Sequence, residues 1–294
     1  MFIATLIAAD RLAAGDISRA RDALAAAGTE PGEAAWLEAE KAADIPFAGD
    51  PAAARGALDA LGGGTDHVVQ AAENRRKKLF VADMDSTMIT VECLDELADY
   101  AGFKDHVAAI TERAMRGELD FIEALDERVS LLKGLSSDIV TQCHEERVRL
   151  MAGGPTLVRT MKAHGARCVL VSGGFTLFAD RVAADIGFDR AIANTLVIEN
   201  GALTGAVARP VVDSATKERV LGEESAALGL QAAETLAIGD GANDLAMIRK
   251  AGLGIAYYGK PKLREAADAR IDHGDLTALL YAQGYRREDW VAEA

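Results

Sequence analysis

Cysteine and positive charge are both scarce in this chain of 294 residues. Its three cysteines, Cys93, Cys143 and Cys168, lie far apart with no CxxC pair, which argues against a disulfide framework and suits unpaired thiols in a reducing cytoplasm. Lysine and arginine number 32 against 46 aspartates and glutamates, which gives a net charge of −14. That charge argues against a nucleic-acid partner, whose phosphates need basic residues. A metal ion and a few local cations would still allow a small anionic substrate in one cleft.

Long apolar runs are also missing, and no segment reaches the length of a membrane-spanning helix. The opening run Met1–Ala9 is apolar, but it lacks a charged leading region and meets Asp10 at once. It is therefore interpreted as a strand and not as a signal peptide. Half of the residues are hydrophobic, so the chain can build a sizeable core, and its length allows one large domain or two. We expect a cytoplasmic protein with no membrane partner.

What the chain does contain is an apolar stretch that runs straight into two carboxylates. Leu79–Ala82 fits a strand buried on both faces of a parallel sheet, and Asp83 and Asp85 follow its carboxyl end, where open α/β sheets bind their ligands. Neighbouring carboxylates repel each other unless a cation neutralises them, and a hard cation such as Mg²⁺ takes oxygen ligands. A strand followed by an ordinary acidic turn explains this stretch equally well.

Two later strands also end in polar, glycine-rich loops. The first loop offers a hydroxyl and backbone N–H groups to an anion, although a simple helix cap explains it too, and the second offers further oxygen ligands for a hard cation. They contain Ser172, Gly173 and Gly174 after the predicted strand 168–171, and Asp240, Asn243 and Asp244 after the predicted strand 235–238. Because successive βα units place strand ends on one edge of a sheet, we expect these residues to converge with Asp83 and Asp85.

Residues 1–75 are predicted to form a small N-terminal domain. The pattern predicts a strand at Phe2–Ala8, a helix at Ile17–Ala27 that stops at Gly28, a helical segment at Glu33–Ala42, and a boundary zone around Pro46, Pro51 and Gly62–Gly64. This part has no metal constellation or phosphate loop. Two interpretations stay open: a regulatory module, or a packing or oligomerisation module such as the contact of a homodimer. The basic run Arg75–Lys78 is interpreted as the solvated start of the next strand.

Residues 88–152 are predicted to form a helical cap. Apolar residues recur near the helical period in the segments 91–100, 104–116, 120–132 and 137–150. An all-helical insert directly after the two aspartates would fold over them as a lid and exclude water. Further along, Asn200-Gly201 between two short apolar runs predicts a hairpin with a type I′ turn.

Four motifs in this order resemble those of the haloacid dehalogenase superfamily of phosphotransferases over about residues 77–280. They are Asp83-Met84-Asp85-Ser86-Thr87, Ser172-Gly173-Gly174-Phe175, Lys217, and Gly239-Asp240-Gly241-Ala242-Asn243-Asp244. Within the superfamily the cap is similar to that of phosphoserine phosphatases, because Glu92 stands seven residues after Asp85 and an Arg128-Val-Ser-Leu-Leu-Lys-Gly run follows Phe121. Without this resemblance, Glu92 and Arg128 would be interpreted as surface residues, and Met115 and Phe121 as core.

The resemblance implies an α/β fold with a Rossmann-like parallel core over residues 76–294, the cap inserted after its first strand. It also implies Mg²⁺-dependent hydrolysis of O-phospho-L-serine, the last step of serine biosynthesis, through an aspartyl-phosphate. Asp83 would be the nucleophile and Asp85 the general acid and base. The metal would be held by Asp83, the backbone carbonyl of Asp85 and Asp240, with Asp244 acting through water. The implied substrate-binding residues are Glu92, Met115, Phe121, Arg128, Ser172, Gly173, Lys217 and Asn243.

Other functions remain open at this point. One keeps the superfamily and changes the substrate, to phosphothreonine, another small phosphomonoester, or phosphate transfer to an acceptor such as homoserine. Another is a catalytically silent binding protein of the same fold, which the complete acidic set argues against. A Ser-His-Asp hydrolase is disfavoured, because the five histidines are scattered and none flanks a nucleophile motif.

Overall fold

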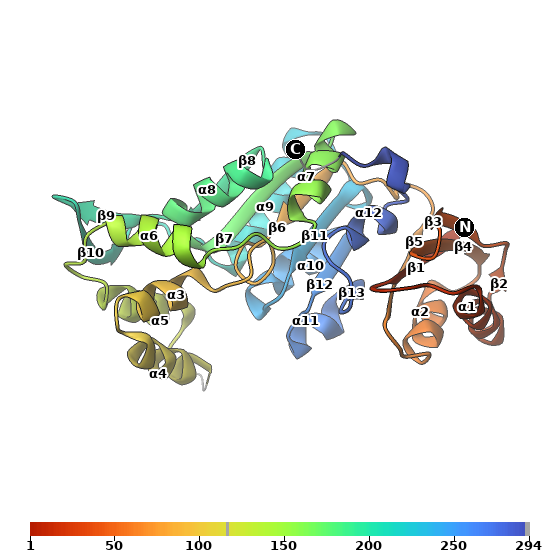
Figure 1. Cartoon of the computed structure of the whole chain (residues 1–294), viewed down its shortest axis with the longest axis horizontal. Coiled ribbons are helices and arrows are strands. Elements are labelled where there is room, and N and C mark those ends of the chain that lie inside the picture. The colour runs from red at the N-terminus through yellow and green to blue at the C-terminus, as the bar shows by residue number, and fades with distance from the viewer. Residues whose placement is uncertain (116–117, 292–294) are drawn as a thin grey trace.

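The computed structural model describes residues 1–115 and 118–291. Within these residues one mixed sheet of eleven strands runs through the molecule, in the order β2-β4-β1-β5-β13-β12-β11-β6-β7-β8, with β3 paired to β4. Figure 1 shows the cap helices at one end of the molecule and the N-terminal strands at the other, with the core between them. No helix in the described ranges has the length and apolar character needed to cross a membrane.

The elements fall into three groups along the chain. The N-terminal part contains β1 (Phe2–Ala8), α1 (Ala14–Ala26), β2 (Glu30–Pro31), β3 (Ala35–Glu38), β4 (Ala42–Ala48), α2 (Pro51–Asp59) and β5 (Thr65–Ala71). The core contains β6 (Leu79–Ala82), α7 (Gly154–Ala163), β7 (Arg167–Phe175), α8 (Thr176–Ile186), β8 (Arg190–Asn194), α9 (Ser214–Ala227), β11 (Thr235–Gly239), α10 (Leu245–Lys250), β12 (Leu253–Tyr257), α11 (Pro261–Ala266), β13 (Ala269–Ile271) and α12 (Ala278–Ala282). The cap contains α3 (Cys93–Tyr100), α4 (Lys104–Met115), α5 (Phe121–Ser130) and α6 (Asp138–Arg147), and the hairpin β9 (Leu196–Glu199) and β10 (Ala202–Val207) lies beside it.

Strand β6 lies at the centre of the parallel part of the sheet, between β11 and β7. All four of its residues are fully buried, because helices cover both faces of the sheet. Phe80 and Ala82 pack into one hydrophobic cluster, while Leu79 and Val81 pack into another. The continuous apolar run is thus the pattern of a strand buried on both sides. The predicted fold class, a parallel α/β core with a helical cap and a small N-terminal α/β part, is confirmed.

The cap and its neighbouring hairpin also agree with the sequence pattern. The four predicted helices are present as α3 to α6, with ends that differ by a few residues. Asn200 and Gly201 have φ angles of 51° and 77°, which a type I′ turn requires. The N–H of Gly134, between α5 and α6, donates to the carbonyl of Leu203 at 2.8 Å. The hairpin therefore fastens this part of the cap to the core.

The N-terminal part departs from the predictions in two places. The segment Glu33–Ala42 is not a helix: it contains β3 and leads into β4, which pairs antiparallel with β1. Its alanines and glutamates favour a helix only weakly, and strand pairing overrides that preference. Gly62–Gly64 is not a boundary either, because it forms the turn between α2 and β5, and β5 pairs along its whole length with β1. The short strands β8 and β13 were not predicted.

The N-terminal strands continue directly into the core sheet. His67 of β5 pairs antiparallel with Arg270 of β13. The carboxylate of Asp66 reinforces this junction by accepting hydrogen bonds from the backbone N–H groups of residues 272–274, at 2.8, 3.3 and 2.8 Å. The two parts are therefore joined by backbone pairing and by a carboxylate that caps the chain after β13.

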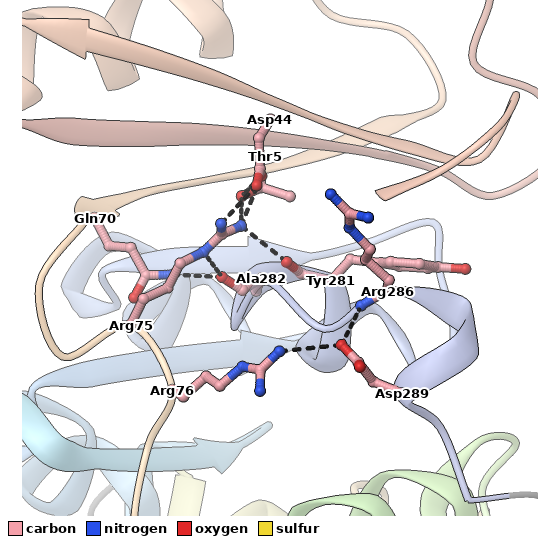
Figure 2. Close-up of polar contacts among 9 residues, drawn as sticks. All are labelled: Thr5, Asp44, Gln70, Arg75, Arg76, Tyr281, Ala282, Arg286 and Asp289. Atoms are coloured by element: carbon pink, nitrogen blue, oxygen red, sulfur yellow. Dashed lines mark hydrogen bonds and ion pairs between the residues drawn. The ribbon is translucent and has the colours of Figure 1, made fainter. Parts of the chain in front are cut away.

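The basic run before β6 was predicted to be solvated. Arg76 and Lys78 are exposed as predicted, but Arg75 is half-buried and Lys77 is buried. Figure 2 shows the guanidinium of Arg75 between the N-terminal strands and α12. It lies 2.5 Å from a carboxylate oxygen of Asp44, donates to Thr5 at 2.7 Å, and donates to the carbonyls of Tyr281 and Ala282 at 3.0 and 2.8 Å. The other three residues of the run also have partners. Arg76 pairs with Asp289 and Lys78 pairs with Glu234, while the buried Lys77 donates from Nζ to the carbonyl of Ala233 at 2.8 Å. Arg75 therefore fastens the N-terminal strands to α12.

Replacing Arg75 by alanine is expected to lower the free energy of unfolding by about 2–4 kcal/mol. The Asp44 carboxylate would keep the hydrogen bond from Thr5 but lose the guanidinium that neutralises it, in a place where its side chain is only 12% exposed, and a buried charge without its counter-charge is costly. Denaturant unfolding followed by circular dichroism measures the change. Arg19→Ala is the control, because Arg19 is 69% exposed in its ion pair with Asp16 and such pairs contribute little. Equal stability of the two variants would contradict the assignment.

Candidate active site

The carboxyl ends of β6, β7, β11 and β12 meet under the cap around a cavity of about 180 Å³. The predicted residues that line it are Asp83, Asp85, Glu92, Phe121, Arg128, Ser172, Gly173, Asp240 and Asn243. Lys217 lies directly beneath, in contact with Asp83. The side chain of Met115 lies outside the described part of the chain. The structure thus brings the other predicted residues together, from the core and from two places in the cap, the start of α3 and α5.

Two larger cavities, of about 300 and 280 Å³, lie against the N-terminal part. Several of the charged groups that line them are paired with one another, as Arg270 is with Asp59 and Arg19 is with Asp16. Carboxylates also line the 300 Å³ cavity, but the cavity of about 180 Å³ lies at the carboxyl ends of parallel strands, the edge where such sheets bind ligands. We therefore place the chemistry in the smaller one.

Three carboxylates form the floor of the cavity. Oxygens of Asp83, Asp240 and Asp244 all lie within 4.8 Å of one another, and all three residues are buried. The loop after β11 permits this approach, because a Cβ at Gly239 would lie 2.3 Å from the Asp244 carboxylate. The N–H of Gly241 also donates to Asp244 at 3.1 Å. Oxygen ligands this close together fit a hard divalent cation.

Lys217 balances part of this charge from inside the protein. Its Nζ lies 2.6 Å from Asp83 Oδ1 and 2.6 Å from Asp244 Oδ1, and its side chain is 1% exposed. Burial by itself would lower the pKa of Lys217, but the two carboxylates more than offset that effect and raise it. Burial, together with the charge of Asp83, raises the pKa of Asp244 to about 7, although Lys217 opposes the shift. We take Lys217 as charged, and the cluster as short of positive charge without a metal ion.

Asp85 lies in a different environment from Asp83. Although the side chain keeps some exposure to the cavity, its removal from bulk water raises the pKa of Asp85 to about 8, and the charges of Glu92 and Asp83 add to the shift. Its Oδ1 accepts the N–H of Cys93, the first residue of α3, at 3.3 Å. Asp85 is therefore a carboxyl group that can hold a proton near neutral pH. The neighbouring carboxylate of Asp83 is instead paired with Lys217.

The cap contributes an acidic side chain, Glu92, and a basic side chain, Arg128, to the cavity. Glu92 Oε1 accepts a hydrogen bond from Ser86 Oγ at 2.7 Å, and burial raises its pKa. Arg128 donates from Nε to the carbonyl of Ala124 at 3.1 Å. Burial lowers the pKa of Arg128, while the carboxylate of Glu92 acts in the opposite direction. Phe121 also lines the cavity and is 41% exposed. A small molecule with both an amino and a carboxylate group would find opposite charges here.

Ser172, Gly173 and Gly174 form the last part of β7, which extends beyond the predicted strand 168–171, and they are held rigidly against the floor. Ser172 Oγ accepts the N–H of Gly174 at 2.8 Å, and a Cβ at Gly174 would lie 2.9 Å from Asp85 Oδ2. The buried Asn194 donates to the carbonyl of Gly173 at 2.8 Å and accepts the N–H of Val212 at 2.7 Å. Asn194 was missed from the sequence, because a buried asparagine at the end of an unpredicted strand leaves no motif.

Lys260 was also missed, although a signal existed. It follows β12, the fourth strand to end at this edge, and it lines the cavity. Its Nζ lies 3.1 Å from Asp240 Oδ2. The rule that parallel strands end at one edge, applied to β12 as it was to the other three strands, would have found it. Leu94, Leu125 and Phe175 supply apolar lining that no sequence motif marks.

Comparison with known proteins agrees with this geometry. A sequence model described as haloacid dehalogenase-like hydrolase matches residues 80–249. The chain belongs to this family. The matched range contains all of β6 except Leu79, together with the cap, β7, Lys217 and the acidic loop after β11.

Curated relatives and a solved structure match this chain over a longer stretch than the family model does. The chain is 48% identical over 208 residues to a phosphoserine phosphatase of Albidiferax ferrireducens, covering 69% of this chain and 88% of that one. It is 46% identical over 206 residues to a phosphoserine phosphatase of Archaeoglobus fulgidus, covering 70% of this chain but only 60% of that one. A solved structure of a probable phosphoserine phosphatase from Vibrio cholerae is 32% identical with a TM-score of 0.79 and covers 98% of this chain and 88% of that one.

Proposed function

We propose that this chain is a Mg²⁺-dependent phosphoserine phosphatase, which hydrolyses O-phospho-L-serine to L-serine and phosphate. One observation carries the proposal: a single cavity of about 180 Å³ combines the carboxylate floor with the cap residues Glu92 and Arg128. The floor suits a phosphoryl group with its metal ion, and the cap pair suits the amino and carboxylate groups of an amino acid. The names of the relatives at 46% and 48% identity support the same substrate.

The first half of the reaction is attack by Asp83 on phosphorus. The Asp83 carboxylate forms a new bond to the phosphorus atom, and the bond between phosphorus and the serine oxygen breaks. Asp85 gives its proton to the departing serine oxygen, for which its raised pKa suits it. Lys217 and the N–H of Met84 both hold Asp83 Oδ1, at 2.6 and 2.8 Å, so the nucleophile is oriented before the substrate arrives.

The second half of the reaction releases phosphate. Asp85, now ionised, takes a proton from a water molecule, which attacks phosphorus and breaks its bond to Asp83. Ser172, Gly173, Lys217 and Asn243 would hold the phosphoryl oxygens through both steps. Asp83, the Asp85 carbonyl and Asp240 would hold Mg²⁺, with Asp244 acting through water, and the bound ion neutralises charge on the phosphoryl oxygens.

The direct test is phosphate release from L-phosphoserine with and without Mg²⁺, beside L-phosphothreonine and p-nitrophenyl phosphate. Release that depends on Mg²⁺ and favours phosphoserine supports the proposal. Preference for another phosphomonoester, or transfer to added homoserine, would keep the chemistry and change the substrate. Absence of release from all three would favour a binding protein of the same fold.

Glu92→Gln and Arg128→Ala are each expected to lower kcat/KM for phosphoserine by about 10- to 100-fold, the usual worth of a charged hydrogen bond. p-Nitrophenyl phosphate has no amino or carboxylate group, so its kcat/KM should change by less than about threefold. Glu96→Gln is the matched control, because Glu96 lies in the first turn of α3, the helix that Glu92 precedes, but pairs with Arg147 instead of lining the cavity. Equal losses on both substrates would contradict the cap assignment.

Other expectations belong to the same proposal. The division of the chain into residues 1–75 and 76–294, with a cap at about 88–152, stays a prediction. So do the cytoplasmic location, a homodimer, and the absence of nucleic-acid and membrane partners.

A further inference from the structure

Lys260 is a cation at the mouth of the cavity that the proposed mechanism does not use. It caps the start of α11, its side chain is 62% exposed, and its Nζ lies 3.1 Å from Asp240 Oδ2. Its backbone N–H donates separately to the carbonyl of Asp240 at 2.8 Å. The backbone bond therefore fixes the position of Lys260, while the long exposed side chain leaves its ammonium group free to move.

The two lysines at the carboxylate floor differ in how they are held. Lys217 is 1% exposed and lies between Asp83 and Asp244, at 2.6 Å from each. Asp240, the third carboxylate, is paired with Lys260, which approaches from the solvent side. An ammonium held inside the protein cannot leave without exposing two buried carboxylates, whereas one at the mouth can turn into solvent at little cost.

Lys260 has a second carboxylate within reach of its electrostatic field. The charges of Asp240 and Glu92 both raise the pKa of Lys260 against the lowering effect of burial. Glu92 also lines the cavity, on the cap side. An ammonium released from Asp240 thus has another anionic group nearby, so its displacement does not leave it without a partner.

We propose that Lys260 is an exchangeable counter-ion of the metal site: it neutralises Asp240 in the metal-free protein and is displaced when a divalent cation binds there. This inference rests on the proposed metal site. An ammonium group and a divalent cation repel each other at contact distance, so both cannot occupy the same side of Asp240. Lys260 therefore competes with the metal ion and sets the concentration at which the site fills.

The sign of this effect separates it from a structural role. If Lys260 only held Asp240 in place, its loss would weaken metal binding. If it competes, its loss should strengthen metal binding, which damage to the fold would not do. For Lys260→Gln we expect a Kd for Mg²⁺ that is about 3- to 5-fold lower, which is the upper range for a partly exposed ion pair.

Isothermal titration calorimetry of the full chain with Mg²⁺ measures this directly, without turnover. Lys260→Arg keeps the charge and should bind Mg²⁺ within twofold of the unaltered protein. Lys262→Gln is the matched control, because the substitution removes the same charge. Lys262 is exposed on α11, the helix that Lys260 caps, and does not line the cavity. This variant should also stay within twofold.

Tighter Mg²⁺ binding by Lys260→Gln alone supports the inference. An unchanged or weaker Kd for that variant would overturn it while leaving the proposed metal site intact. An equal gain for Lys262→Gln would overturn it too, because the effect would then come from net charge. If the unaltered protein binds no Mg²⁺, the metal site itself fails, and this inference fails with it.

Discussion

Asp83→Asn is expected to reduce phosphate release from phosphoserine by at least about 10⁴-fold, in line with the removal of other enzymatic nucleophiles. An amide of the same shape keeps the packing around Lys217 but cannot form an acyl phosphate with phosphorus. Asp83 is 3% exposed at the end of β6, and the substitution replaces one carboxylate oxygen by an NH2 group and removes the negative charge with little change in shape. The site then loses its covalent step.

Two measurements check this result. The rate of phosphate release gives the size of the loss, and the intact mass of acid-quenched protein shows whether a phosphoryl group is attached. The unaltered protein should carry the adduct during turnover and the variant should not. Asp99→Asn, an exposed carboxylate of the cap that pairs with Arg147, is the control for any general effect of charge. A variant at Asp83 that still forms the adduct would refute the assignment.

Asp85→Asn is expected to lower kcat for phosphoserine by roughly 10²- to 10⁴-fold, the usual contribution of general acid–base catalysis. The serine oxygen is a poor leaving group that needs a proton, and the attacking water must lose one. p-Nitrophenolate leaves without help, so with this substrate the variant should still form the aspartyl-phosphate and stop there. The observable is a burst of p-nitrophenol close to the enzyme concentration, followed by slow turnover.

The outcome that would contradict this role is equally concrete. A variant at Asp85 within tenfold of the unaltered protein on phosphoserine would show that another group moves the proton. A loss without any burst on p-nitrophenyl phosphate would show that Asp85 is needed for the attack itself. Melting curves of both variants guard against a change in folding, since Asp85 accepts a backbone hydrogen bond from the first residue of α3.

The arrangement of the site could be predicted because its residues lie at the ends of strands and the starts of helices. Asp83, Ser172 and Asp240 each follow a short apolar run, and the parallel order of β7, β6 and β11 then brings them together. Local pattern and topology determine such positions. Asn194 could not be predicted in the same way, because its importance depends on hydrogen bonds to residues distant in the sequence.

The N-terminal part shows the opposite case. Glu33–Ala42 has the composition of a helix, yet β4 needs partners on both edges, and β3 supplies one of them. Arg75 has the composition of a surface residue, yet its partners lie about 30, 70 and 207 positions away along the chain. Contacts this distant in sequence leave no local pattern, so the interpretation of a solvated basic run had nothing to correct it.

The continuous sheet decides how any event at the N-terminal part could reach the site. A module on a flexible linker can reorient without disturbing its neighbour. Strand β5 is instead bonded to β13, and the sheet continues from β13 through β12 to β11. A displacement of β5 would therefore shear the sheet through β13 and β12, and would reach β11, whose carboxyl end leads into Asp240. By the same bonding, amide hydrogens along this junction should exchange with solvent through one shared opening event, as they do within a single folding unit.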